Sequence, residues 1–257
     1  MIYEATNEGK KKIAPMFEGM LDTLILSCLQ GHMGTAWVND VDNPTAAQII
    51  VGDFAFYAGD AYATGVEELL RNIPEHMLII VDTDEWKERI EEVHAGSLDK
   101  FLRYQFYKNP EHLKKEHVQT FLSHLPTGYE LVKLDTSIVH EPTLHELSDD
   151  FIARFDSGED YVERGIGYAI LHEGKVVCGA GSYSIYDSGI EIDIVTHKNH
   201  RRKGLATVAA AALIMDCLEQ DKYPSWDAAN TNSAKLAEKL GYVFKEAYDT
   251  YYIHTEK

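Results

Sequence analysis

Hydrophobic positions recur along the chain with two periods. A period of about three and a half residues is typical of helices with one buried face, and a period of about two is typical of half-buried strands. In the first half, the pattern predicts helices over residues 18–28, 64–71, 84–94 and 110–125, and strands over 34–38, 46–57, 77–81 and 101–107. Helices and strands mixed in this way are typical of an α/β domain.

Pro126 and Gly128 mark the predicted domain boundary, because these residue types interrupt regular structure. Beyond them, the pattern predicts strands over 129–134, 167–171, 175–183, 190–195 and 226–229, helices over 144–155, 204–219 and 233–240, and one or two closing strands over 243–253. The prediction is an α/β chain with a smaller α/β domain at residues 1–126 and a mixed sheet flanked by helices at residues 127–257.

Composition narrows the choice of partners. The chain has 257 residues and a formal net charge of −18, which disfavours binding to nucleic acid or to an anionic membrane surface. Three scattered cysteines (Cys28, Cys178 and Cys217) provide neither a disulfide framework nor a zinc site. The first residues lack a signal-peptide pattern, and no apolar run approaches the roughly 20 residues that a membrane span requires, so we expect a cytoplasmic protein.

The most informative segment is residues 192–206. An apolar strand pattern leads into a polar turn that contains Arg201, Arg202 and Lys203, and Gly204 and Ala206 then begin an apolar helix. A helix N-terminus presents free backbone N–H groups and a favourable dipole, and neighbouring cations add to its attraction for anions. The segment therefore predicts a phosphate site, although a solvated basic turn before a helix would have the same composition.

This turn resembles a family signature. Arg201-x-x-Gly204-x-Ala206 is similar to the Q/R-x-x-G-x-G/A pattern of the GNAT superfamily of acyl-CoA-dependent N-acyltransferases, and residues 230–242 are similar to the family's N-x-x-S/A-x-x-L-Y-E-K-L-G-F block. The resemblance covers residues 129–253. Two features, the strand at residues 226–228 and the Leu-Ala-Glu-Lys version of the second block at residues 236–239, look most like the branch that includes zwittermicin A resistance acetyltransferases.

The resemblance implies how acetyl-CoA would bind. The turn would hold the coenzyme A pyrophosphate through Arg201, Arg202, Lys203, Gly204, Leu205 and Ala206. The preceding strand would pair with pantetheine at Ile194 and Val195, and the Val195 amide would polarise the thioester carbonyl. Asn230 and Ser233 would contact the far side of the cosubstrate. His197 and His200 flank the turn and are expected to be loop residues, with cofactor contact as the alternative.

Catalysis requires a neutral amine, and alkylamines with a pKa of about 10 need a base to remove a proton at neutral pH. Glu191 matches the strand carboxylate that serves this role in the family, usually through water. Asp193 lies on the same face of the strand by its period of two. Both carboxylates have alternative interpretations, as exposed strand residues or as ligands of a cationic substrate.

The chain departs from the family at Ala237, where the family often has a tyrosine that protonates the departing thiolate. Tyr248, Tyr251 and Tyr252 follow downstream as candidates, and we select Tyr252. No metal is expected. The two histidines in residues 140–145 do not have the spacing that would put both imidazoles on one helix face.

The predicted function is transfer of an acetyl group from acetyl-CoA to an amine of a small molecule by direct attack. The N-terminal domain, a candidate degenerate copy of the same fold, would wall the acceptor pocket or form a homodimer interface. Two alternatives remain. One is a non-catalytic coenzyme-A-binding sensor, which Ala237 favours. The other is an aminoacyl transferase of the paired-domain type, which the net charge disfavours.

Overall fold

The structure, a computed structural model, describes residues 1–20, 22–148 and 150–254. Its contacts divide the chain into two compact units. The first contains Met1–Arg103 and Ala247–Lys257, and the second contains Tyr104–Glu246. The two units are described separately below.

The first unit contains a mixed sheet with helices. In chain order its elements are β1 (Tyr3–Glu4), α1 (Asn7–Ile13), the 3-10 helix η1 (Ala14–Phe17), α2 (Thr23–Leu29), β2 (Thr35–Val38), β3 (Ala46–Val51), β4 (Phe54–Gly59), α3 (Val66–Arg71), β5 (Leu78–Ile80), α4 (Asp84–Val93) and β6 (Leu98–Phe106). Strand β13 (Phe244–Ile253) ends in this unit, and the sheet order is β1-β2-β3-β4-β5-β13-β6. Strands β4 and β5 are parallel, whereas the pairs from β1 to β4 are antiparallel.

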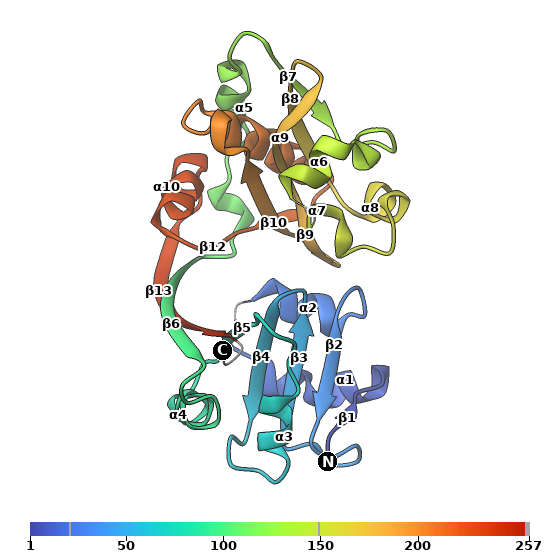
Figure 1. Cartoon of the computed structure of the whole chain (residues 1–257), viewed down its shortest axis with the longest axis vertical. Helices are drawn as coiled ribbons and strands as arrows, with labels where there is room; N and C mark the ends of the chain where they lie inside the picture. The colour runs from blue at the N-terminus through green and yellow to red at the C-terminus, as the bar shows by residue number, and fades with distance from the viewer. Residues whose placement is uncertain (21, 149, 255–257) are drawn as a thin grey trace. The chain divides into compact units, whose positions relative to one another are not determined.

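The second unit is built around a five-stranded mixed sheet. Its elements are η2 (Pro110–His112), α5 (Lys115–Gln119), η3 (Thr120–His124), β7 (Tyr129–Lys133), η4 (Ile138–His140), α6 (Pro142–Leu147), α7 (Asp150–Ala153), α8 (Gly158–Arg164), β8 (Gly167–His172), β9 (Lys175–Tyr186), β10 (Gly189–Thr196), η5 (Lys198–His200), α9 (Leu205–Glu219), β11 (Tyr223–Ser225), β12 (Asp227–Ala228) and α10 (Thr231–Leu240). The sheet order is β11-β10-β9-β8-β7. Figure 1 shows α9 on one face of this sheet and α6 to α8 on the other.

Both units follow the same order of elements. A first strand and several helices precede three antiparallel strands, and a helix then leads to a strand parallel to the last of the three. In the first unit these final partners are β4 and β5, and in the second they are β10 and β11. This correspondence supports the proposal that the first unit is a degenerate copy of the second.

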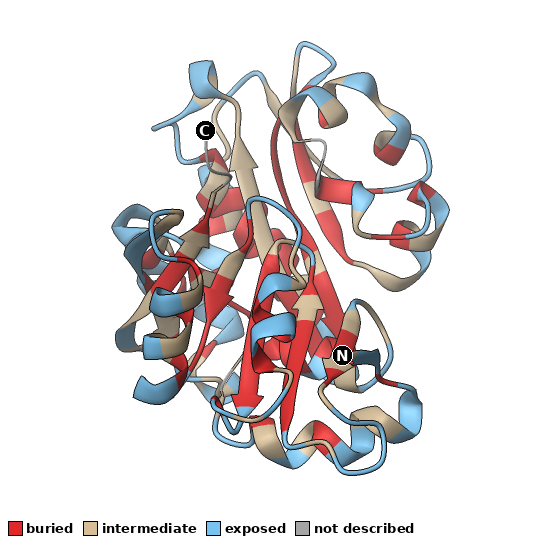
Figure 2. Ribbon diagram, turned by 60° about the horizontal axis from the view of Figure 1, so that its bottom comes forward, coloured by how far each residue is buried: buried red, intermediate tan, exposed pale blue. Residues whose placement is uncertain are grey.

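Buried residues are concentrated on the strands of both sheets. Figure 2 shows buried positions concentrated on the sheets and exposed positions on loops and outer helix faces. Helix α9 is buried almost along its whole length, because apolar residues surround its axis instead of forming one stripe. The predicted mixed α/β fold is therefore confirmed.

The segment before Tyr129 packs within the second unit. Phe106, Leu113, Val118 and Phe121 belong to one hydrophobic cluster with residues of α9, α10 and β12. Burial of these side chains gives the segment its contacts with the second unit, so the division falls near residue 103 and the predicted boundary at residues 126/127 lies inside that unit.

Three predicted elements differ from those observed. Residues 46–57 form the hairpin of β3 and β4 instead of one strand, because the chain turns at Gly52, whose φ is 58°. Residues 110–125 form three short helices, since Leu113 and Lys114 adopt extended backbone. The helix predicted over residues 144–155 is interrupted after α6, where Ser148 is extended.

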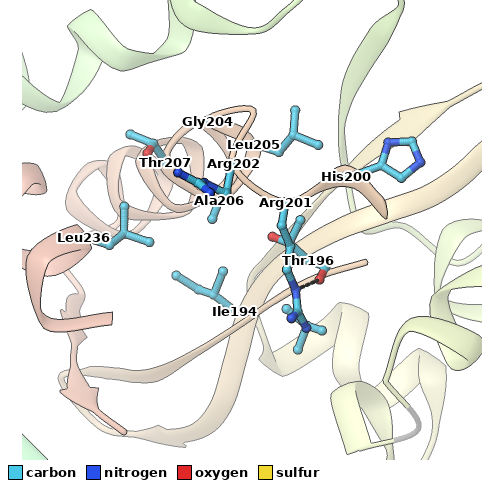
Figure 3. Close-up of a pocket in the computed structure, with 11 residues that line it drawn as sticks. Ile194, Thr196, His200, Arg201, Arg202, Gly204, Leu205, Ala206, Thr207 and Leu236 are labelled. Atoms are coloured by element: carbon cyan, nitrogen blue, oxygen red, sulfur yellow. Dashed lines mark hydrogen bonds between the residues drawn. The ribbon is translucent and has the colours of Figure 1, made fainter. Parts of the chain in front are cut away.

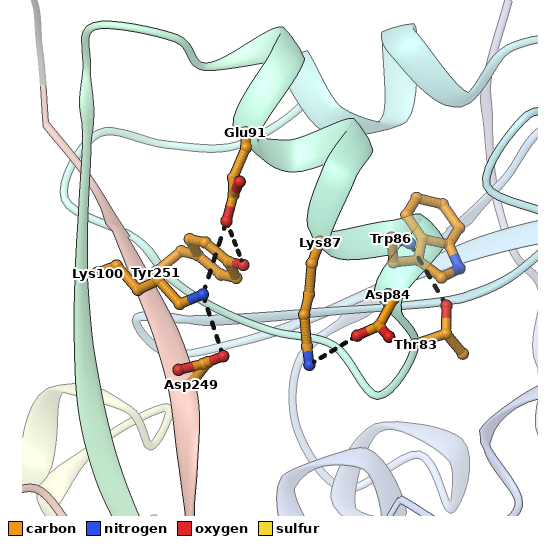
Figure 4. Close-up of polar contacts among 8 residues, drawn as sticks. All are labelled: Thr83, Asp84, Trp86, Lys87, Glu91, Lys100, Asp249 and Tyr251. Atoms are coloured by element: carbon orange, nitrogen blue, oxygen red, sulfur yellow. Dashed lines mark hydrogen bonds and ion pairs between the residues drawn. The ribbon is translucent and has the colours of Figure 1, made fainter.

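Polar contacts attach the end of β13 to α4 and β6 within the first unit (Figure 4). The Tyr251 hydroxyl donates to Glu91 Oε1 at 2.8 Å. Lys100 Nζ lies 3.1 Å from Asp249 Oδ2 and 3.7 Å from Glu91 Oε1. Burial and the hydrogen bond to Glu91 raise the pKa of Tyr251 to about 12.

Replacing Tyr251 by Phe is expected to lower the free energy of unfolding by about 1 kcal/mol, because a partly buried hydrogen bond to a carboxylate is lost. This contribution should be complete below the ordinary pKa of 10 and should disappear as the pH rises towards the folded-state pKa of about 12. Urea unfolding of the wild type and the variant across this pH range measures both effects.

The matched control is Tyr62→Phe. The Tyr62 hydroxyl also donates to a glutamate of α4, Glu88, at 3.2 Å, but the residue is 61% exposed. Tyr62→Phe should therefore lower the free energy of unfolding by less than Tyr251→Phe does. Equal decreases for the two variants would contradict the role assigned to Tyr251.

Candidate active site

Strands β10 and β11 separate part of the way along their length, and we call the point of separation the fork. They pair in parallel from Gly189 to Glu191, and Glu191 lies opposite Ser225 in the last pair. Beyond Trp226 the chain forms β12, which pairs antiparallel with the end of β6. Strand β10 continues to Thr196 along β9. Among the described residues, the β11 edge of β10 is therefore unpaired past the fork.

Two backbone hydrogen bonds show which amides face that edge. Tyr223 N donates to Ser188 O at 2.7 Å across the β11 side, and His197 N donates to Val177 O at 2.9 Å across the β9 side. Because successive residues of a strand point their N–H and C=O groups to opposite sides, even-numbered positions of β10 face the fork and odd-numbered positions face β9.

Because of this alternation, the amides of Ile194 and Val195, which the resemblance assigns to the cosubstrate, point to opposite sides of β10. The Ile194 amide faces the open edge, whereas Val195 lies opposite Gly179 and its amide faces β9. The register therefore directs the Ile194 amide into the fork, instead of the Val195 amide that the resemblance indicates. The Thr196 carbonyl also faces the open edge, where it accepts a hydrogen bond from Arg201 Nε at 3.2 Å.

The turn after β10 presents backbone amides at the start of α9. Arg202 and Gly204 both have left-handed backbone, with φ of 64° and 83°. Gly204 caps the helix, and the amides of Leu205 and Ala206 lie in its first turn, where N–H groups point out of the helix end. An added Cβ at Gly204 would have no heavy atom within 4 Å, so the backbone conformation and not crowding selects glycine.

A pocket of about 430 Å³ lies between β10, this turn and α10 (Figure 3). Its lining joins the open edge of β10 to the first turn of α9. The lining residues are Ile194, Val195, Thr196, His200, Arg201, Arg202, Gly204, Leu205, Ala206, Thr207 and Leu236. Seven of these, Ile194, Val195, Arg201, Arg202, Gly204, Leu205 and Ala206, are among the predicted site residues.

Electrostatics at the pocket favour an anion. Arg201 and Arg202 line it, and the N-terminal end of α9 adds a partial positive charge. Partial burial, together with the nearby Lys203, His172 and His197, lowers the pKa of His200, which favours its neutral form. Its Nδ1 lies 2.9 Å from the Tyr129 hydroxyl.

Three predicted cosubstrate residues contact other groups. Lys203 Nζ donates to the Tyr129 hydroxyl at 2.8 Å. Asn230 caps α10 by accepting from two backbone amides, and Ser233 Oγ accepts from Trp226 Nε1 at 3.1 Å. Among the described residues, the pocket lining includes none of Lys203, Asn230 and Ser233.

The predicted base lies at the fork itself. Glu191 is buried, with its side chain 8% exposed, and its Oε2 lies 3.9 Å from Lys108 Nζ. Asp193 continues along the same strand and is partly exposed. Glu191 thus occupies the last paired position before the edge of β10 becomes open.

Tyr252 belongs to the first unit, where it pairs with Leu78 of β5. Its hydroxyl lies 2.6 Å from His76 Nδ1. Ala237 is fully buried in the hydrophobic cluster beside α9. Position 237 therefore offers no proton to the site, and the assignment of Tyr252 as proton donor stays a prediction.

Thr196, Thr207 and Leu236 line the pocket although no sequence motif indicated them, and His200, expected to be a loop residue, lines it as well. A period of two along β10 could have indicated Thr196, because Ile194 and Thr196 share one side of the strand. Leu236 comes from α10, and only the folded chain brings that helix to the turn.

Within the described residues, no group of three His, Cys, Asp or Glu side chains could hold a metal ion. None of the described helices has the length and apolar character needed to cross a bilayer.

A mixed sheet that separates beside a glycine turn at a helix N-terminus is the arrangement that the resemblance to α/β acyltransferases predicts. The sequence pattern of the GNAT acetyltransferase family matches residues 14–251, so the chain belongs to this family.

Similar proteins cover the whole chain. The N-acetyltransferase YdfB of Bacillus subtilis (strain 168) is 26% identical over 264 residues, which cover 98% of each chain. A solved GCN5-related N-acetyltransferase-like protein from Streptococcus suis 89/1591 is 34% identical with a TM-score of 0.88, over 96% of this chain and 99% of that one. A tandem GNAT protein from the clavulanic acid biosynthesis pathway shares the fold, with a TM-score of 0.58 and 10% identity over 100% and 99% of the two chains.

Gly204→Ala is expected to lower the free energy of unfolding by about 1–2 kcal/mol, because a Cβ is unfavourable at a φ of 83°. Gly204→Asn should cost less, since asparagine tolerates left-handed backbone better than alanine does. Chemical denaturation measures both variants, and an alanine variant at least as stable as the wild type would contradict the conformational explanation.

Proposed function

We propose that the protein transfers an acetyl group from acetyl-CoA to an amine of a small molecule by direct attack. The observation that carries this proposal is the fork, whose open edge on β10 continues into a pocket at the N-terminal end of α9. An extended chain with amide groups can pair with an open strand edge, and a pyrophosphate suits a helix N-terminus. Acetyl-CoA combines both groups in one molecule.

The pyrophosphate of acetyl-CoA would lie at the turn. Backbone amides of Gly204, Leu205 and Ala206 would donate to its oxygens, and Arg202 would contribute a cation at the same place. The pantetheine arm would then run along the open edge of β10 towards Glu191. This route uses the part of the pocket lined by Ile194 and Leu236.

Polarisation of the thioester carbonyl is assigned to the Ile194 amide. The register directs this N–H into the fork, and it is fixed by the strand instead of being carried by a mobile side chain. A fixed donor stabilises the oxyanion that forms when the amine attacks, without reorganisation during the reaction.

Glu191 is assigned as the general base. It would take a proton from the acceptor ammonium, directly or through water, so that the nitrogen lone pair attacks the carbonyl carbon. The C–N bond forms, the C–S bond breaks with its electron pair leaving on sulfur, and the nitrogen gives up a second proton to solvent as the amide forms. A thiol pKa near 8.5 makes the thiolate a fair leaving group, and it takes up a proton afterwards. Tyr252 stays the predicted donor of that proton.

The acceptor is proposed to be a small cationic amine. The excess of 42 acidic over 24 basic residues favours approach of cations over approach of anions. The first unit would wall the acceptor site or form a homodimer interface, as the sequence analysis predicts. Burial of Ala237 leaves a coenzyme-A-binding sensor as the second candidate.

Release of free thiol from acetyl-CoA across a panel of small amines tests the proposed activity. Wild-type protein should turn over at least one amine, and Glu191→Gln should lower kcat by about 10²–10⁴, because general base catalysis is lost. Glu130→Gln, an exposed change on β7, is the matched control and should leave kcat unchanged. Tight coenzyme A binding without turnover of any amine would favour the sensor.

Proline substitution tests the assignment of the Ile194 amide. Ile194→Pro removes an N–H that faces the open edge, where proline is tolerated in a strand, and should lower kcat by about 10²–10³ while the fold persists. Val195→Pro removes an N–H that faces β9 and should instead lower the thermal midpoint. Circular dichroism and the thiol assay distinguish the two, and full activity of a folded Ile194→Pro variant would reject the assignment.

A further inference from the structure

The ammonium group of Lys108 lies beside both residues of the last β10–β11 pair before the fork, Glu191 and Ser225. Glu191 of β10 and Ser225 of β11 lie opposite each other, and both are buried. Lys108 Nζ donates a hydrogen bond to Ser225 Oγ and lies 3.9 Å from Glu191 Oε2. One ammonium group therefore contacts both strands at the point where they separate.

The backbone next to Lys108 is held in place from two sides. Tyr107 N donates to Val243 O at 3.0 Å, and Tyr107 O accepts from the Tyr223 hydroxyl at 3.2 Å. Tyr223 is the first residue of β11, so the segment that carries Lys108 is attached to the same strand as Ser225. The ammonium thus reaches the fork from a fixed position and not from a mobile loop.

The surroundings of Glu191 make this cation important. Side-chain exposure is 8% for Glu191 and 17% for Lys108, and a carboxylate at such a depth is unfavourable without a compensating charge. Three tyrosines, on β9, on β11 and after α10, lie close enough to respond to the charge of Glu191, namely Tyr186, Tyr223 and Tyr242. Burial raises the pKa values of the three tyrosines, and nearby groups that include Glu191 contribute further. The tyrosine hydroxyls therefore stay neutral.

We propose that Lys108 is a positioning residue for Glu191, whose carboxylate it holds aimed at the fork while the acceptor amine is deprotonated. Lys108 acts through Glu191 and does not itself touch the reacting atoms. Its hydrogen bond to Ser225 keeps it on the β11 side, so that the carboxylate remains available to accept a proton. The proposal rests on the proposed function, in which Glu191 is the base.

Kinetics of Lys108→Met test the proposal. Without the cation, the buried carboxylate loses the positive charge beside it, so the acidic limb of the pH profile of kcat should move to higher pH. We expect kcat near neutral pH to fall at least about tenfold. The KM for acetyl-CoA should change by less than about twofold, since Lys108 is outside the pocket lining.

Two variants separate positioning from a general structural effect. Lys108→Arg keeps the charge and should keep the acidic limb near its wild-type position. Lys245→Met removes an ammonium that pairs with Glu246 elsewhere in the same unit, and it should change neither kcat nor the pH profile. An unshifted acidic limb in Lys108→Met would overturn the proposal, as would an equal shift in Lys245→Met.

A measurement without substrate keeps this test independent of the proposed function. In urea unfolding, Lys108→Met should be less stable than the wild type near pH 7, and the difference should shrink as acid protonates the carboxylate. Adding Glu191→Gln to Lys108→Met should recover stability, because the buried carboxylate that Lys108 faces is then neutral as well.

The outcomes are distinguishable. If the wild type acetylates no amine, the proposed function fails, while unfolding still decides whether Lys108 and Glu191 are paired. If Lys108→Met does not fold, folding of the double variant with Glu191→Gln supports the pairing. A double variant no more stable than Lys108→Met overturns it.

Discussion

The separation of β10 from β11 is the constraint on which the rest of the second unit depends. Two parallel strands pair until Glu191 meets Ser225, and β12 then pairs with β6 instead of continuing along β10. The edge of β10 is open because the chain beyond β11 pairs with β6 instead of with β10. Because β10 stays paired with β9 as far as Thr196, its exposed amides keep the rigidity of a paired strand while they face a pocket.

The charges around the fork differ on its two sides. At the turn, Arg201 and Arg202 and the dipole of α9 favour an anion, and the lowered pKa of His200 means that this histidine adds little positive charge. At the last paired position, the carboxyl group of Glu191 is buried beside the Lys108 ammonium. A cosubstrate with a phosphate at one end and a reacting carbonyl at the other fits this polarity, and so does a cationic acceptor.

The two units repeat one order of elements, yet only the second has a glycine turn with flanking arginines at the helix that follows its three antiparallel strands. In the first unit, α3 also begins after a left-handed glycine, Gly65, but its first turn carries Glu67 and Glu68. Two carboxylates at a helix N-terminus would repel a pyrophosphate. The repeated fold with an altered helix start is consistent with a degenerate copy, in which only the second unit would keep the proposed cosubstrate site.

By itself, the sequence determined the features that depend on local chemistry. Gly204 with its neighbouring cations, the helix behind it and the mixture of helices and strands could all be predicted, because propensity, caps and periodicity act over a few residues. Only the tertiary structure decided that the Ile194 amide faces the fork, since the direction of an amide depends on the pairing register. It also brought Lys108, more than 80 residues away in the chain, to Glu191. Such long-range contacts form when apolar segments are buried together, and no local pattern of residues 104–126 specifies the unit that they join.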